Sequence, residues 1–177
     1  MLFTDISNFN KVSDYISILN GSLLSDFIII FGAIYFPQLI KSGLLRNWYK
    51  TYGLSAIIVD TLILVIGIII ARAVYNKIFG EEFNIFKFAL LVLIIQIIHD
   101  FALYFIVIKP LPRGMNNIID MFKDYANEVS VGAVVGDSIM ITMAVFFASL
   151  FAGNNTNTNI VILIVLAYIL PYIVHAK

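Results

Sequence analysis

Three carboxylates and one imidazole lie inside long apolar stretches of this 177-residue chain. Asp60, the neighbouring pair His99 and Asp100, and Asp137 are each surrounded in the sequence by Ile, Leu, Val, Phe and Ala. Ionised carboxylates that share a dry layer repel one another, and each charge alone is unfavourable by several kcal/mol. Protonation, a bound cation, an imidazolium at His99 or water in a cavity would relieve this. These residues therefore predict a site that binds or conducts protons or small cations.

Four neutral polar residues have the spacing to support this site. Gln96, Asp100 and Tyr104 are four residues apart and share one helical face, next to His99. Ser138 and Thr142 follow Asp137 on the next apolar segment. We expect Gln96, Tyr104, Ser138 and Thr142 to be the supporting polar residues of the site.

Two alternatives remain open for the same residues. Neutral acids could bridge helices by hydrogen bonds, as in a non-catalytic structural or assembly protein. An intramembrane metal-dependent enzyme could use His99, Asp100, Asp60 and Asp137, although the HExxH-like spacing of metal hydrolases is missing. The chain has no cysteine, so thiolate metal sites and iron–sulfur clusters are excluded, and we expect no cofactor. An enzyme is the less favoured class.

The composition places these residues in a membrane. Hydrophobic residues make up 61% of the chain and charged residues 12%, against roughly 25% charged in a soluble domain. We predict an all-α integral membrane bundle of four to five transmembrane helices, with spans near residues 22–40, 54–75, 87–108, 130–152 and 159–175. With zero net charge and no basic patch, nucleic acid is not expected as a partner.

Two segments outside the spans have amphipathic spacing. Apolar residues recur at steps of three and four over 1–21 and over 114–129, with charged residues between them. Both predict interfacial helices on the bilayer surface. The expected organisation is an interfacial helix over 1–21 followed by a single transmembrane bundle over 22–177.

Counting residues from the ends of the spans gives the depth of each polar group. At 1.5 Å per residue, Asp60, Asp100 and Asp137 lie roughly 9, 12 and 11 Å from the same side of the membrane. Asp26 and Arg72 lie roughly 6 and 5 Å from the other side. We therefore predict one layer of acids with His99, and a separate structural ion pair between Asp26 and Arg72.

The distribution of Lys and Arg predicts the orientation. The side with the acid layer, called side B, carries seven of these residues, namely Lys41, Arg46, Lys50, Lys109, Arg113, Lys123 and Lys177. The other side, called side A, carries Lys11, Arg72, Lys77 and Lys87. The positive-inside rule then predicts an outside N-terminus and a cytoplasmic C-terminus.

The segment "QIIHDFALYF…LPRGMNNIIDMFKDYANEVSVGAVVGDS", within residues 96–138, resembles uncharacterised multispan proteins encoded by large double-stranded DNA viruses. The Ile-, Asn- and Phe-rich composition is similar to theirs. This resemblance implies a location in a virion membrane or an infected-cell membrane. It raises the expectation of a structural or assembly role. Besides the lipid bilayer, the candidate partners are virion or capsid proteins and a second copy of the chain.

Overall fold

The computed structural model describes residues 2–38, 40, 42–129 and 131–176, and over these residues all regular structure is helical. Its elements are α1 (Asp14–Tyr35), α2 (Gly43–Tyr52), α3 (Leu54–Phe79), α4 (Ile85–Ala102), the π-helix η1 (Leu103–Ile108), α5 (Asn117–Val129), α6 (Val131–Phe151) and α7 (Thr156–Val174). Five helices are long and apolar enough to cross a membrane: α1, α3, α4 continued by η1, α6 and α7. The prediction of an all-α bundle with five membrane-type helices is confirmed.

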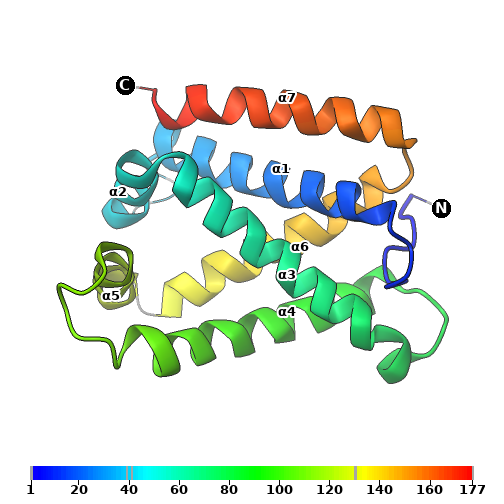
Figure 1. Cartoon of the computed structure of the whole chain (residues 1–177), viewed down its shortest axis with the longest axis horizontal. Helices are drawn as coiled ribbons and strands as arrows, with labels where there is room; N and C mark the ends of the chain where they lie inside the picture. Colours follow the sequence, from blue (N-terminus) through cyan, green and yellow to red (C-terminus); the bar gives the residue numbers. More distant parts are fainter. Residues whose placement is uncertain (1, 39, 41, 130, 177) are drawn as a thin grey trace.

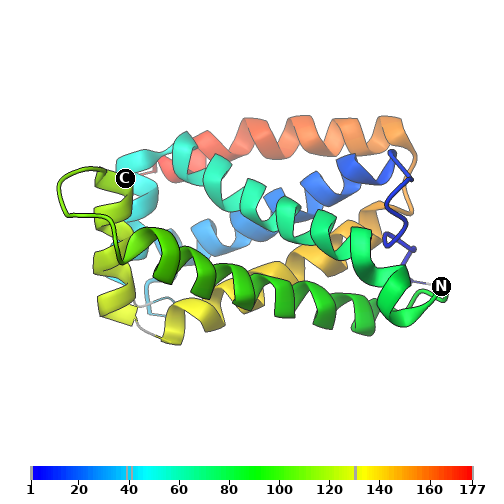
Figure 2. The ribbon, with the colours of Figure 1, turned by 60° about the horizontal axis from the view of Figure 1, so that its bottom comes forward.

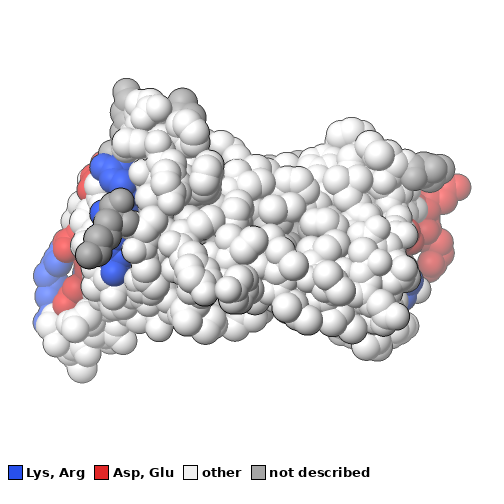
Figure 3. Space-filling model, turned by 90° about the horizontal axis from the view of Figure 1, so that it is seen from above, with Lys and Arg blue, Asp and Glu red and all other residues white. Residues whose placement is uncertain are grey.

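The long helices alternate in direction between two ends of the bundle (Figures 1 and 2). End A, which corresponds to the predicted side A, holds the N-terminus and the turns 80–84 and 152–155. End B, which corresponds to the predicted side B, holds α2, α5 and the C-terminus. Lys, Arg, Asp and Glu gather at the two ends in the view of Figure 3, and a band free of charge separates them. This distribution suits a bundle whose middle faces lipid.

The first helix packs against the last two. Gly21 of α1 faces the α6 backbone so closely that a Cβ there would lie 2.5 Å from Ala148 N and 2.6 Å from Ala144 O. The side chain of Ser25 donates a hydrogen bond to Met140 O of α6 at 2.6 Å. On the α7 side, Asn20 Nδ2 donates to the carbonyl oxygen of Asn159 at 2.8 Å. Polar and small residues thus join α1 to its neighbours.

The predicted boundaries of the first span are wrong. The helix begins at Asp14 and ends at Tyr35, whereas the prediction was 22–40, whose residue Leu39 lies outside the described residues. Residues 2–13 form turns and irregular structure, so the predicted interfacial helix over 1–21 is also wrong. Residues such as Asn20 lowered the local hydropathy, but they are buried because other helices supply their hydrogen-bond partners.

The second amphipathic prediction, 114–129, corresponds to the helix α5. This helix lies across end B, approximately perpendicular to the long helices (Figures 1 and 2). Glu128 Oε1 accepts hydrogen bonds from Ser42 Oγ at 2.9 Å and from Gly43 N at 3.1 Å, which tie α5 to the start of α2. Two helices therefore cover end B where only one was predicted.

Candidate functional site

A large cavity lies in the half of the bundle next to end B. It has a volume of about 1110 Å³ and is lined by residues of α1 to α6 and η1. Asp60, Asp100 and Asp137 all line it, as do residues of α2 and α5 at end B. We call it the acid cavity. The structure therefore brings the three predicted carboxylates to one space, although they come from three different helices.

Asp60 is held in place by the turn between α2 and α3. Gly53 takes the left-handed φ of 52° at this turn, which favours glycine, and so lets α2 fold back against α3. Trp48 Nε1 of α2 then donates a hydrogen bond to Asp60 Oδ2 at 2.9 Å. The helix α2 itself was not predicted, although Ser42 caps its first turn by accepting from Leu45 N at 3.0 Å.

The predicted ion pair between Asp26 and Arg72 is wrong. Asp26 lies near enough to Asp60 for the two charges to interact, whereas Arg72 pairs with Asp14. Asp26 is fully buried, and its carboxylate accepts hydrogen bonds from Tyr49 Oη at 3.1 Å and Thr61 Oγ1 at 3.4 Å. Burial, followed by the negative charges of Asp26 and Asp60, raises the pKa of the Tyr49 phenol well above its usual range. Tyr49 therefore stays protonated and keeps donating.

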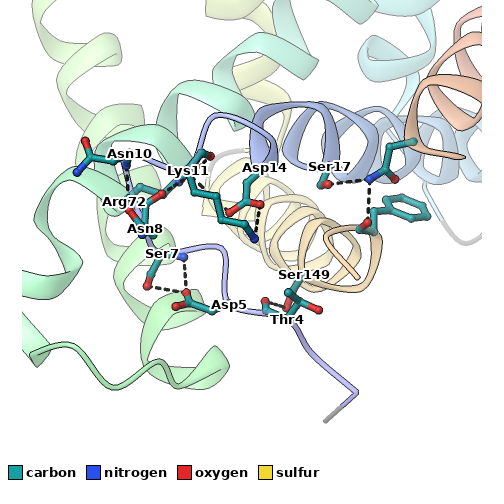
Figure 4. A network of polar contacts seen from close by, with 12 residues as sticks. Thr4, Asp5, Ser7, Asn8, Asn10, Lys11, Asp14, Ser17, Arg72 and Ser149 are labelled. Atoms are coloured by element: carbon teal, nitrogen blue, oxygen red, sulfur yellow. Dashed lines mark hydrogen bonds and ion pairs between the residues drawn. The ribbon is translucent and has the colours of Figure 1, made fainter. Parts of the chain in front are cut away.

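Arg72 instead fastens the N-terminal segment at end A (Figure 4). Its guanidinium donates to the carbonyl oxygens of Asn8 and, at 2.9 Å, Lys11. Its Nη2 lies 3.6 Å from Asp14 Oδ2, and Lys11 Nζ lies 2.8 Å from Asp14 Oδ1. Arg72 thus has structural contacts at end A, but its acidic partner is Asp14 and not the predicted Asp26.

Asp100 lies on the predicted polar face of α4. Gln96 Nε2 donates to Asp100 Oδ1 at 2.7 Å, and His99 Nδ1 lies 3.2 Å from the same oxygen. The other oxygen, Oδ2, is buried and has no hydrogen-bond partner among the described residues. Gln96 and Tyr104 line the acid cavity, whereas His99 is absent from its lining and its side chain is 36% exposed.

Asp137 is the acid of the cavity that no described side chain supports by a hydrogen bond. The charges acting on it are those of Asp100 and Asp60. The predicted helpers of Asp137 bond to their own helix instead: Ser138 Oγ donates to Val134 O at 2.6 Å and Thr142 Oγ1 to Ser138 O at 2.7 Å. Asp137 is therefore free to interact with whatever fills the cavity.

The described residues contain no group of three or more His, Asp or Glu side chains that could share a metal ion. The acids line one large space without converging on one point. The alternative of a metal-dependent enzyme with Asp60, His99, Asp100 and Asp137 as ligands consequently has no metal site in this part of the chain. What the arrangement can do is exchange protons and attract positive charge.

No protein-family model, curated protein or solved structure matches this chain.

Proposed function

We propose that this membrane protein binds protons or small cations at Asp60, Asp100 and Asp137 and passes them between this layer and end B. The observation that carries the proposal is the acid cavity, which holds the three carboxylates and extends to α2 and α5. A dry layer in which every acid is paired would have favoured a purely structural role. Intramembrane ionisable groups that face a cavity are typical of ion and proton pathways.

The hydrogen bonds of the acids support protons as the transferred species. Trp48 supports Asp60 and Gln96 supports Asp100, while Asp137 has no such donor. Asp137 can therefore gain or lose a proton without breaking a hydrogen bond to another described side chain. A proton also needs no shared coordination sphere, which suits acids that do not converge.

The tight packing toward end A supports access from one side. Ile18, Leu64 and Ile68 are fully buried between the cavity and end A, and Gly21 brings α1 against α6 in the same region. In this conformation the acid layer communicates with end B. Full transport across the membrane would require this packing to open.

The proposal is tested by proton flux into proteoliposomes that contain a pH-sensitive dye. We expect flux with the wild-type protein, and a several-fold lower flux with Asp137→Asn and with Asp100→Asn. Asp124→Asn is the matched control, because Asp124 is an exposed acid on α5 that pairs with Arg113 outside the cavity. Its flux should equal that of the wild type.

Two results would overturn the proposal. One is the absence of proton and small-cation flux in correctly folded wild-type protein. The other is unchanged flux in both Asp137→Asn and Asp100→Asn. Either result would favour the structural or assembly role.

A further inference from the structure

We propose that the acid cavity takes an amphiphilic organic cation, an ammonium or phosphonium group on an apolar body, which reaches it from the bilayer. This inference rests on the proposed function, because the same carboxylates would bind either the proton or the organic cation. The carboxylates alone do not specify which class of cation binds, whereas the size and lining of the cavity favour an organic one.

The volume of the acid cavity is the first reason. It measures about 1110 Å³, whereas a water molecule occupies about 30 Å³. Pockets for small organic molecules run from about 300 to 1,000 Å³. A site for protons or a bare metal ion needs far less space. The volume of the acid cavity therefore fits an organic molecule better than a bare ion.

The separation of the carboxylates is the second reason. Asp60, Asp100 and Asp137 are contributed by α3, α4 and α6, and Glu128 of α5 also lines the cavity. Among the described residues these carboxylates form no group of three that could share one metal ion. Asp100 Oδ2 is buried at the cavity and lacks a hydrogen-bond partner among the described residues. Negative groups spread around a wide space neutralise a bulky cation better than a compact one.

The aromatic lining is the third reason. Trp48, Phe101, Tyr104, Phe105, Phe122 and Tyr125 all line the cavity. Trp48 and Phe122 lie with ring centroids 5.0 Å apart. The faces of aromatic rings attract organic cations and also provide apolar contact for the rest of the ligand. Aromatic rings together with carboxylates favour a ligand that has a positively charged group attached to apolar groups.

The exposed apolar part of the cavity lining is the fourth reason. The helices α3 and α4 meet near end A, where the turn 80–84 joins them, and diverge toward end B (Figures 1 and 2). Three lining residues on the outer surface of these helices and of η1 are well exposed: Val59 by 37%, Phe101 by 50% and Phe105 by 54%. These three residues are apolar and lie on helices that are long and apolar enough to cross a membrane. A lipophilic cation can therefore enter sideways.

The chain contains one built-in probe of this site. Trp48 is its single tryptophan, and Trp48 lines the cavity. We would titrate full-length protein in lipid nanodiscs with tetraphenylphosphonium and follow tryptophan fluorescence. Tetraphenylborate has nearly the same shape and the opposite charge, so it is the matched ligand control.

The expected result is a saturable change with tetraphenylphosphonium and none with tetraphenylborate. Asp137→Asn and Asp100→Asn should each weaken binding about tenfold, which corresponds to about 1.4 kcal/mol. Asp124→Asn should bind as the wild type does. Because protons compete for the same carboxylates, acidification should weaken binding, and calorimetry in two buffers should detect proton release on binding. Circular dichroism and thermal melting establish that the variants fold.

The inference is overturned if tetraphenylborate binds equally well, if no saturable change occurs, or if both folded Asn variants bind like the wild type. Equal binding of both ions would assign the cavity to uncharged lipid or apolar molecules. Proton flux without phosphonium binding would refute the organic cation and leave the proposed function standing. Phosphonium binding without flux of protons or small cations would refute the proposed function and leave an organic-cation site.

Discussion

Gly21 has no room for a side chain, because a Cβ would lie 2.5 Å from Ala148 N and 2.6 Å from Ala144 O. Both atoms belong to the α6 backbone, so the two helices would have to move apart. We expect Gly21→Ala to lower the free energy of unfolding by about 1–3 kcal/mol, as overpacked sites do. Unfolding in mixed detergent micelles measures the change.

Gly136 is the matched control for this substitution. It also lies in a helix, and a Cβ there would meet no atom within 4 Å. Gly136→Ala should leave stability unchanged or raise it by up to about 1 kcal/mol, because alanine favours the helix. Equal stability of the Gly21→Ala variant and the wild type would contradict the close packing of α1 on α6.

At the residue scale, depth counting grouped Asp60, Asp100 and Asp137, which line one cavity in the structure, but it misassigned Asp26. The three predicted acids lie in spans whose apolar residues run nearly without interruption, so their ends could be located within a few residues. Asp26 was counted from residue 22, but its helix begins at Asp14, which places it about 18 Å from that end. Partners such as Tyr49 are brought to it by the fold, and spacing in the sequence does not encode them.

At the scale of elements, tertiary contacts explain what the hydropathy pattern missed. The pattern located α3, α4 with its continuation η1, α6 and α7 within a few residues, since lipid-facing helices must be apolar on most sides. It misplaced α1, whose polar side chains face other helices: Asn159 Nδ2 donates to Ser17 Oγ at 3.0 Å. A buried polar face cannot be distinguished from a solvated one by composition alone.

The hydrogen bonds from Arg72 to the segment 2–13 lead to a prediction at this scale. Arg72→Met removes the bonds to the carbonyls of Asn8 and Lys11 and leaves buried Asp14 paired with Lys11 alone. We expect the free energy of unfolding to fall by about 2–4 kcal/mol, since hydrogen bonds to charged groups contribute more than neutral ones. Amide hydrogen exchange should accelerate in residues 2–13.

Lys77→Met provides the comparison, because Lys77 is exposed near the same end of α3. Exchange in residues 2–13 should stay unchanged in this variant. If Arg72→Met also left that exchange unchanged, Thr4 would have to hold the segment alone through Ser149, whose Oγ donates to Thr4 O at 2.6 Å.

For the whole molecule, the five long helices alternate in direction, so Asp14 at the start of α1 and Val174 at the end of α7 lie at opposite ends of the bundle. The chain has no cysteine, so a single introduced cysteine reports its own position. Glu82 lies in the turn at end A and Lys50 on α2 at end B, and both are exposed. We expect a membrane-impermeant maleimide to label Glu82→Cys and Lys50→Cys from opposite sides of sealed vesicles.

Labelling of both positions from the same side would rule out the alternating arrangement. The side on which each is labelled also tests the predicted orientation. That prediction used seven Lys and Arg residues at end B, of which Lys41 and Lys177 lie outside the described residues. A cytoplasmic Lys50 is expected.

The packing of α1 also has a consequence for how the protein is made. The helix α1 comes before the other long helices in the chain, yet its Asn20 bonds to Asn159, 139 positions later. Until Asn159 has been synthesised, Asn20 lacks this partner. The packing of α1 on α7 must therefore wait for the last long helix described here, and until then water or the insertion machinery has to keep the polar face of α1 away from lipid.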